Sequence, residues 1–282
     1  MTECFFVSDL HGSVEKYRRL FSAVKAARPR AVFIGGDILP HFGSRDTPQD
    51  FVRDHLLREL GRLRERLGAE YPRVFLILGN DDPRINEESI LEGAAAGLLS
   101  YVHMKKDRFD SWSIYGYAMT PPSPFRLKDW ERYDVSQYVN PGSVSPEEGV
   151  RSVPVEPDEV RYGTIAADLA RLTDSDDIGN AVVLFHAPPY RTGLDRAPLD
   201  GMTVDHVPLD VHIGSIAIRN FIEGRQPLLT LHGHAHESPR ITGVWREHIG
   251  RTLAISAAHD GPELALVRFD LENLDGATRN LV

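Results

Sequence analysis

The stretch that decides the fold is LLTLHGHAHES, residues 228–238, in which an apolar run ends in three histidines at alternate positions. The run 228–231 is typical of a buried strand. His232, His234 and His236 would therefore follow the carboxyl end of that strand. His232 falls outside the pairing of His234 with His236, and we interpret it either as a structural group or as one that supports the metal ligands without binding the metal. Two imidazoles one residue apart can reach one metal ion or two adjacent ones, so the stretch predicts a metal site.

Four further apolar runs end in residues that can bind a metal. These runs, at 4–8, 31–37, 74–80 and 181–186, predict strands. In chain order, the residues at their ends are Asp9 and His11, then Asp37, then Asn80 and Asp81, then His186. Ligands in open α/β sheets bind outside the carboxyl ends of the strands, so five strands would bring their ligands to one rim. Mixed carboxylate and imidazole ligands suit Zn, Mn or Fe better than Ca or a thiolate site.

Helical patterns separate the first three predicted strands. Ser13 is a typical helix N-cap, and apolar side chains recur at helical spacing from there to Pro29. A second helix is predicted to begin at Thr47 and Pro48. Helices between apolar strands indicate βαβ units, so we expect a largely parallel sheet in this part of the chain.

The later part of the chain is organised differently. Prolines interrupt the segment 120–155, which is predicted to be a long ordered loop, and a second long loop runs from the strand at 181–186 to about residue 212. The closing strands have no helices between them, so we expect them to be antiparallel. The remaining elements expected from apolar patterning are helices over 157–172 and 214–223, the latter ended by Gly224, and strands over 111–119, 227–232, 252–257 and 263–270. No linker divides the chain, so we expect one α/β domain over 1–282.

Composition excludes several classes of protein. The net charge of −9 argues against a broad basic surface for long nucleic acid, so we expect no such partner. Cys4 is the only cysteine, which excludes an internal disulfide and favours a reducing compartment. The opening residues lack the basic and apolar pattern of a signal peptide, and no apolar run reaches the roughly 20 residues of a membrane span. We therefore expect a cytoplasmic protein with no membrane partner; the oligomeric state stays open.

The five strand-end signals form one ordered pattern. They are D-x-H at 9–11, G-D at 36–37, G-N-D at 79–81, a lone His at 186 and G-H-x-H at 233–236. This order resembles the calcineurin-like metallophosphoesterase superfamily. The stretches PPSPFRLKDWERYD (121–134) and HIGSIAIRNFIEGRQPLLTLHGHAHES (212–238) are similar to its branch related to cyclic-nucleotide phosphodiesterases. The resemblance implies a four-layer α/β/β/α sandwich with two mixed β-sheets.

The resemblance also implies a site with two divalent metal ions. One metal would be held by Asp9, His11 and His236, the other by Asn80, His186 and His234, with Asp37 bridging both. Two dications about 3.5–4 Å apart can hold a phosphate and activate a water or hydroxide for in-line attack. We expect Asp37, Asn80 and His234 to contribute to catalysis as well, and the loss of Asp37 to be most damaging. Mn, Fe, Zn and Ni all suit these ligands, and we favour Mn.

One position departs from the superfamily pattern. Many members carry a histidine after the Asn, where it protonates the leaving group, but this chain has Asp81. A carboxyl group beside cations has a pKa far below neutral and is a poor acid at pH 7. Three alternatives stay open: an undemanding leaving group, another histidine in the same role, or Asp81 orienting a metal ligand. His41, four residues past Asp37, is the first substitute, followed by His206 and His212.

The function expected from this pattern is hydrolysis of a phosphoester bond, with a small phosphodiester or nucleotide as the favoured substrate. The acidic surface and the absence of a histidine acid at position 81 tilt the choice toward diesters. The first alternative is a phosphomonoesterase or phosphoprotein phosphatase, because one fold hosts several phosphate chemistries. The second is a non-catalytic scaffold stabilised by metal. Such scaffolds lose ligands, whereas all seven positions are filled here.

Overall fold

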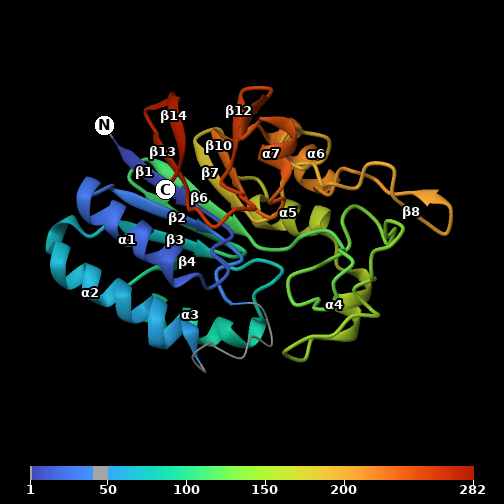
Figure 1. Ribbon diagram of the computed structural model, residues 1–282, viewed down its shortest axis with the longest axis horizontal. Coiled ribbons are helices and arrows are strands. Elements are labelled where there is room, and N and C mark those ends of the chain that lie inside the picture. Colours follow the sequence, from blue (N-terminus) through green and yellow to red (C-terminus); the bar gives the residue numbers. More distant parts are fainter. Residues whose placement is uncertain (1, 41–49) are drawn as a thin grey trace.

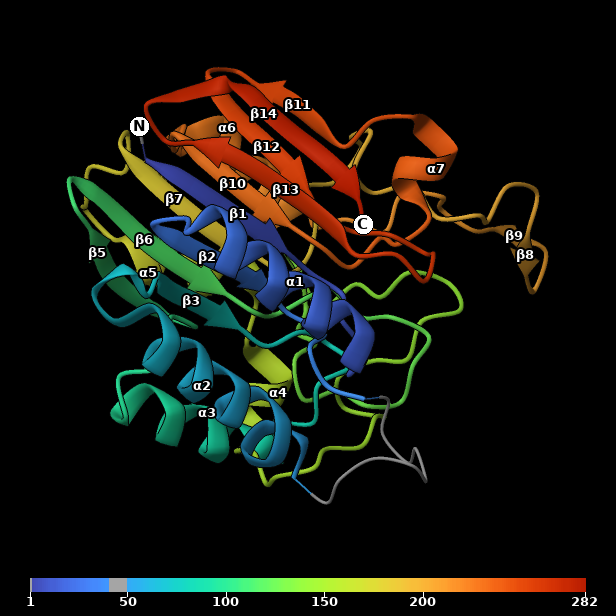
Figure 2. The ribbon, with the colours of Figure 1, turned by 60° about the vertical axis from the view of Figure 1, so that its left-hand side comes forward.

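Two six-stranded mixed sheets form the centre of the protein (Figures 1 and 2). The computed structural model describes residues 2–40 and 50–282. In spatial order, the first sheet consists of β14 (Asn273–Leu281), β13 (Ala265–Asp270), β1 (Glu3–Val7), β2 (Ala31–Gly35), β3 (Arg73–Ile77) and β4 (Ser100–Tyr101). The second consists of β11 (Arg246–Ile249), β12 (Thr252–Ser256), β10 (Leu229–His232), β7 (Ala181–Phe185), β6 (Trp112–Tyr117) and β5 (Lys105–Phe109).

Helices cover the outer face of each sheet. Against the first sheet lie α1 (Val14–Ala27), α2 (Arg58–Leu67) and α3 (Glu87–Ala95), as Figure 2 shows. Against the second lie α5 (Ile165–Thr173) and α6 (Ile216–Arg225), which contact each other. Because β2 contacts β7 and β3 contacts β6, the inner faces of the sheets pack together. The predicted four-layer α/β/β/α sandwich is therefore confirmed.

Strand composition explains why the core lies between the sheets. The run ECFFV of β1 and the run AVVLF of β7 are buried almost throughout, as expected for strands covered on both faces. Phe33 of β2 stacks on Phe75 of β3 with ring centroids 5.1 Å apart. Such residues favour strands because branched and aromatic side chains fit a pleated, buried surface.

Strand direction positions the site. The strands β1, β2, β3 and β4 are mutually parallel, and so are β6, β7, β10 and β12. The carboxyl ends of β1, β2 and β3 therefore share one edge of the first sheet, and those of β7 and β10 share one edge of the second. The predicted parallel arrangement of the early strands is confirmed. The prediction that the closing strands are antiparallel to one another is wrong: β10 and β12 are parallel neighbours, and β13 lies in the other sheet, antiparallel to β1.

Several predicted boundaries also change. The single helix expected over 157–172 is two helices, α4 (Pro157–Tyr162) and α5, because Gly163 is extended and Thr164 begins a new helix as its N-cap. The stop expected at Gly224 is wrong, since α6 continues to Arg225 and ends where Gln226 is left-handed. The start predicted at Thr47 and Pro48 lies outside the described residues.

The two long loops are present. The segment 120–155 contains no helix or strand, as predicted. The second loop carries a small hairpin, β8 (Thr203–Val204) with β9 (Val207–Pro208), that the sequence pattern did not indicate. The short helix α7 (Ser238–Thr242), together with α3, β4, β5, β11 and β14, was also not expected. No helix of 2–40 or 50–282 is long and apolar enough to cross a membrane.

Candidate metal centre

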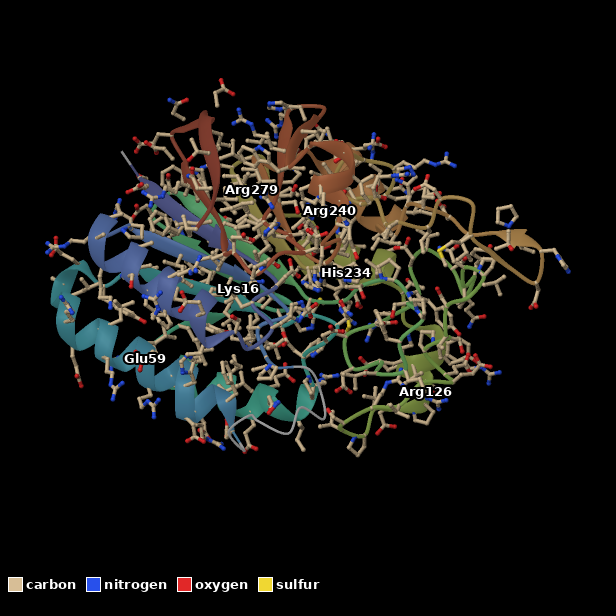
Figure 3. All side chains as sticks on the ribbon, in the orientation of Figure 1. Lys16, Glu59, Arg126, His234, Arg240 and Arg279 are labelled. Carbon is tan, nitrogen blue, oxygen red and sulfur yellow. The ribbon has the colours of Figure 1, made fainter. Side chains whose placement is uncertain are left out.

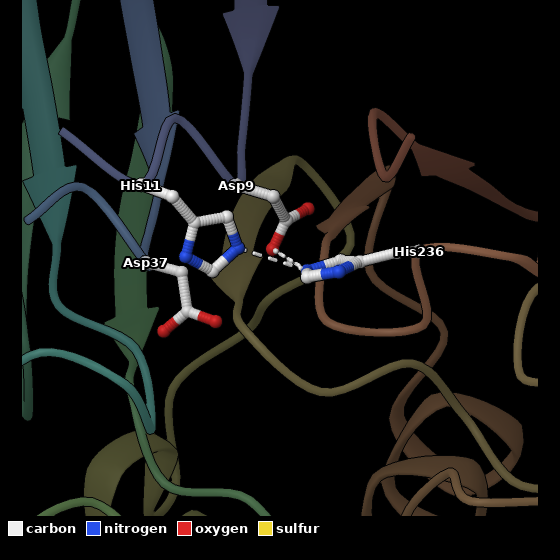
Figure 4. Close-up of side chains that lie close together, drawn as sticks. All are labelled: Asp9, His11, Asp37 and His236. Atoms are coloured by element: carbon white, nitrogen blue, oxygen red, sulfur yellow. Dashed lines mark hydrogen bonds and ion pairs between the residues drawn. The ribbon is translucent and has the colours of Figure 1, made fainter. Parts of the chain in front are cut away.

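The ends of five strands bring two groups of metal-capable side chains together. The first group contains Asp9, His11, Asp37 and His236, and the second contains Asp37, His186 and His234. Within each group, one ligand atom per residue lies within 4.8 Å of all the others. Figure 4 shows the first group, in which the rings of His11 and His236 meet nearly at right angles, with an interplanar angle of 79°. Their Nε2 atoms are 3.1 Å apart.

Asn80 joins the second group through its side-chain oxygen. Asn80 Oδ1 lies 3.0 Å from His186 Nε2 and 2.7 Å from His234 Nδ1. The other ring nitrogen of His186 lies 2.8 Å from the carbonyl oxygen of Gly35, to which it donates. That contact leaves Nε2 to face Asn80 and Asp37, since the second nitrogen of a metal-binding histidine usually donates to such a group.

Unusual backbone conformations aim several of these side chains. Asp9, His11, Asp37 and His234 all have left-handed backbones, with φ of 57°, 45°, 51° and 69°. A non-glycine residue in this region costs on the order of 1 kcal/mol or more, and such strain clusters at functional sites. The turns that follow β1, β2 and β10 therefore hold these residues in backbone conformations that are locally unfavourable. The surrounding structure must stabilise these conformations.

Hydrogen bonds between neighbouring turns provide that support. The N–H groups of Asp9 and His11 donate to the carbonyls of Gly36 and Asp37 at 3.0 and 2.8 Å. The N–H of His234, from the other sheet, donates to Asp9 Oδ1 at 3.1 Å. These bonds fix the turns of both sheets relative to one another.

Asp82 is a buried support that sequence reasoning missed. Its carboxylate accepts the N–H groups of Ile38, Leu39 and Gly79 at 3.1, 2.8 and 2.8 Å. Burial, followed by the charge of Asp37, raises the pKa of Asp82 to about 7. The available signal was an acidic residue directly after G-N-D, but Asp is so common in turns that it did not stand out.

Lys16 is a second missed support. Its ammonium group is buried and donates to the carbonyl oxygen of Asp9 at 3.1 Å. Figure 3 shows Lys16 on α1 and His234 on the segment after β10. An amphipathic helix pattern does not distinguish a lysine that turns inward at the first turn from one that faces water.

Glycines leave room for the ligands. A Cβ added to Gly79 would overlap Asp37 Oδ1, and one added to Gly233 would overlap Ser8 Oγ and approach Asp9 Oδ2 to 2.9 Å. The motif glycines at these two positions therefore allow the backbone to pass directly beside the carboxylates of Asp37 and Asp9.

The buried carboxylates of the site favour positive charges beside them. Burial raises the pKa of Asp9, but His236 outweighs burial and lowers this pKa to about 2. Asp9 in turn outweighs the burial of His236 and raises the pKa of that imidazole to about 9. Likewise, buried His186 has its pKa raised to about 10 by Asp37, whose own pKa is held well below its usual range.

The donor set fits divalent metal ions. Asp9 Oδ2 is buried and accepts no hydrogen bond from any residue in 2–40 or 50–282. Burial, followed by His186, lowers the pKa of His234 to about 3, which keeps this imidazole in the neutral form that binds metals. Carboxylate, amide and imidazole donors around a buried, unsatisfied oxygen are the ligands that Mn, Fe, Zn or Ni accept.

The other predicted residues are placed as follows. His232 is buried in the core, stacked on Phe185 and 2.9 Å from the carbonyl oxygen of Ala187. His212 Nδ1 contacts the buried carboxylate of Asp195 at 2.7 Å, and His206 is exposed in the turn between β8 and β9. Asp81 lies beside Asn80, while His41 lies outside the described residues.

A family model described as calcineurin-like phosphoesterase matches residues 4–238. No curated protein sequence matches. Similar solved structures include TT1561 of Thermus thermophilus, 14% identical with a TM-score of 0.56, covering 99% of this chain and 98% of that chain. At this identity the likeness bears on the fold alone.

Two further structures are more distant. A dimetal phosphatase from Danio rerio is 14% identical with a TM-score of 0.47, covering 94% of this chain and 91% of that chain. A phosphodiesterase described as archaeal is 9% identical with a TM-score of 0.47, covering 99% of both chains. The activities in these names belong to those two proteins.

Proposed function

Because this chain belongs to the calcineurin-like phosphoesterase family, we propose that it hydrolyses a phosphoester bond of a small phosphodiester or nucleotide, using two divalent metal ions. The observation that carries the proposal is the pair of ligand groups that share Asp37. A carboxylate shared by two groups favours a dinuclear site, since its negative charge offsets the repulsion between two cations.

The proposed ligands follow from the two groups. One ion would be held by Asp9, His11, Asp37 and His236, and the other by Asp37, Asn80, His186 and His234. When bound, a metal pair holds the phosphate and lowers the pKa of a water for in-line attack. We favour Mn²⁺ as the ion to supply first.

The protein's own contribution is preorganisation. The strained turns and the hydrogen bonds between them hold the ligands before any ion binds, so little reorganisation is left for the reaction. A small diester remains the favoured substrate, because the net charge of −9 disfavours long polyanions and position 81 lacks the usual histidine. We propose His41 as the proton donor from its place in the sequence, four residues past Asp37.

The test compares an aryl phosphodiester with the corresponding monoester. Protein stripped of metal by a chelator is assayed with and without restored Mn²⁺, beside Asp37→Asn. Cleavage that requires metal, favours the diester and is lost in the variant is expected. Preference for the monoester would replace the proposed substrate class. Binding of Mn²⁺ by folded protein with no turnover of either ester would overturn the enzymatic proposal and indicate a metal-stabilised scaffold.

A further inference from the structure

We propose that Asp81 is a positioning residue that sets the orientation of the Asn80 amide toward the metal site, rather than the donor of a proton to the leaving group. The proposal rests on the proposed function, since it concerns the same site. It concerns the position where this chain departs from the usual histidine of its family.

The two ends of the Asn80 amide face different partners. Its Nδ2 donates to Asp81 Oδ1 at 3.1 Å, while its Oδ1 faces His186 and His234. An ionised carboxylate can only accept hydrogen bonds, and an amide offers an acceptor at one end and a donor at the other. The carboxylate of Asp81 therefore selects the orientation in which the amide oxygen faces the cation site.

A flipped amide would damage the site. It would place an NH₂ group toward the cation and bring the Asn80 oxygen against the carboxylate of Asp81. Amide orientation is assigned from hydrogen-bond partners, and here both ends of the amide agree. Without an acceptor at position 81, the NH₂ end of the amide is no longer held by a hydrogen bond. The orientation of its oxygen would then depend on the ion alone.

Residue 81 also reaches the group formed by Asp9, His11, Asp37 and His236. The backbone N–H of Asp81 donates to Asp37 Oδ1 at 2.8 Å, so residue 81 contacts the shared carboxylate directly. Asp81 Oδ2 lies 3.9 Å from Nδ1 of His11, a member of the first group. Residue 81 thus touches or approaches ligands of both groups, as expected for a residue that fixes the ligand geometry.

The experiment separates positioning from proton donation. Asp81→Ala and the isosteric Asp81→Asn are compared with the wild type for Mn²⁺ affinity, measured calorimetrically without substrate. The same proteins are assayed on aryl phosphodiesters whose leaving phenols range from strongly to weakly acidic. Asp275→Ala is the matched control, because it makes the same chemical change at an exposed position of β14 that belongs to neither ligand group. Thermal unfolding confirms that each variant is folded.

A positioning role predicts two results. Asp81→Ala should lower Mn²⁺ affinity about 10- to 100-fold, the range typical of residues that orient metal ligands. Turnover should fall by a similar factor for every leaving group and recover at high Mn²⁺. Asp81→Asn, which keeps an acceptor oxygen at this position, should lose less.

Two outcomes would overturn the inference. One is unchanged Mn²⁺ affinity with a loss of turnover that grows as the leaving phenol becomes less acidic, which identifies a proton donor. The other is no change in either measurement. Metal binding is measured without substrate, so an inactive wild type would contradict the proposed function while still deciding the role of Asp81.

Discussion

The carboxylate of Asp82 accepts the backbone N–H of Leu39 at 2.8 Å and so ties the turn that carries Asn80 to the turn that carries Asp37. The same carboxylate also accepts the N–H groups of Ile38 and Gly79. A single buried side chain thereby links two loops from neighbouring strands.

The first prediction concerns Asp82→Ala. The substitution leaves three backbone N–H groups without their acceptor, at about 1–3 kcal/mol for each buried group. We expect the free energy of unfolding to fall by roughly 3 kcal/mol or more, measured by urea unfolding of the metal-free protein. Asp82→Asn keeps one acceptor oxygen and should lose less. A change below about 1 kcal/mol in both variants would show that these bonds do not hold the turns.

The second prediction concerns the motif glycines. Gly233→Ala places a methyl group against Ser8 and Asp9, so we expect weaker Mn²⁺ binding and a lower melting temperature. Gly61→Ala in α2 is the control, because an added Cβ there meets no atom within 4 Å. In a helix interior this control should stabilise the protein by up to about 1 kcal/mol. If Gly233→Ala binds Mn²⁺ as tightly as the wild type, the added methyl group does not disturb the site, and the steric explanation is wrong.

The third prediction concerns Asp37 and Asp9. Because Asp37 belongs to both ligand groups and Asp9 to one, Asp37→Asn should lower the amount of bound Mn²⁺ more than Asp9→Asn does. Elemental analysis after dialysis against Mn²⁺ measures the stoichiometry. Equal losses in the two variants would argue against Asp37 as a shared ligand.

The fourth prediction is a pH dependence set by His103. Burial, followed by the charges of Arg84 and Arg132, lowers the pKa of His103 to about 3, and its Nδ1 accepts the N–H of Ala118 at 3.0 Å. In the unfolded chain the pKa is about 6.5. The folded state therefore favours the neutral ring, so this stabilisation is complete above pH 6.5 and is lost as the pH falls toward 3.

The measurement compares His103→Asn with the wild type. Asn keeps an acceptor near the position of Nδ1 but does not titrate. Between pH 7.5 and 4.5 the wild type should lose roughly 3 kcal/mol more free energy of unfolding than the variant. Parallel pH profiles in the two proteins would mean that His103 does not contribute to acid sensitivity.

The fifth prediction concerns His41. If it donates the proton, His41→Ala should reduce cleavage of diesters with weakly acidic phenols far more than that of diesters with strongly acidic ones. For Asp81→Ala, in contrast, we expect turnover to fall by a similar factor with every leaving group. Equal losses across leaving groups would remove His41 from that role.

Much of the fold follows from local patterns. Buried strands such as β1 and β7 are apolar runs in the sequence, and Ser13 caps α1 as expected by accepting the N–H of Lys16. The partner of each strand was harder to predict, because hydrophobic periodicity does not say whether a neighbour runs parallel. That is why β12 beside β10 was misassigned. The split between α4 and α5 depends on one glycine whose conformation the pattern does not specify.

By itself, the sequence determined which side chains end the strands: Asp9, Asp37, Asn80, His186 and the histidines after β10 follow apolar runs in an order that also reveals the family. Chemistry and chain order are local properties, and residue types carry them. Only the tertiary structure decided that Asp82 joins two turns, that Lys16 turns inward to Asp9, and that Asp81 faces the amide of Asn80. These contacts depend on the angle and depth at which the turns meet, which are set by the packing of the two sheets and not by any one segment.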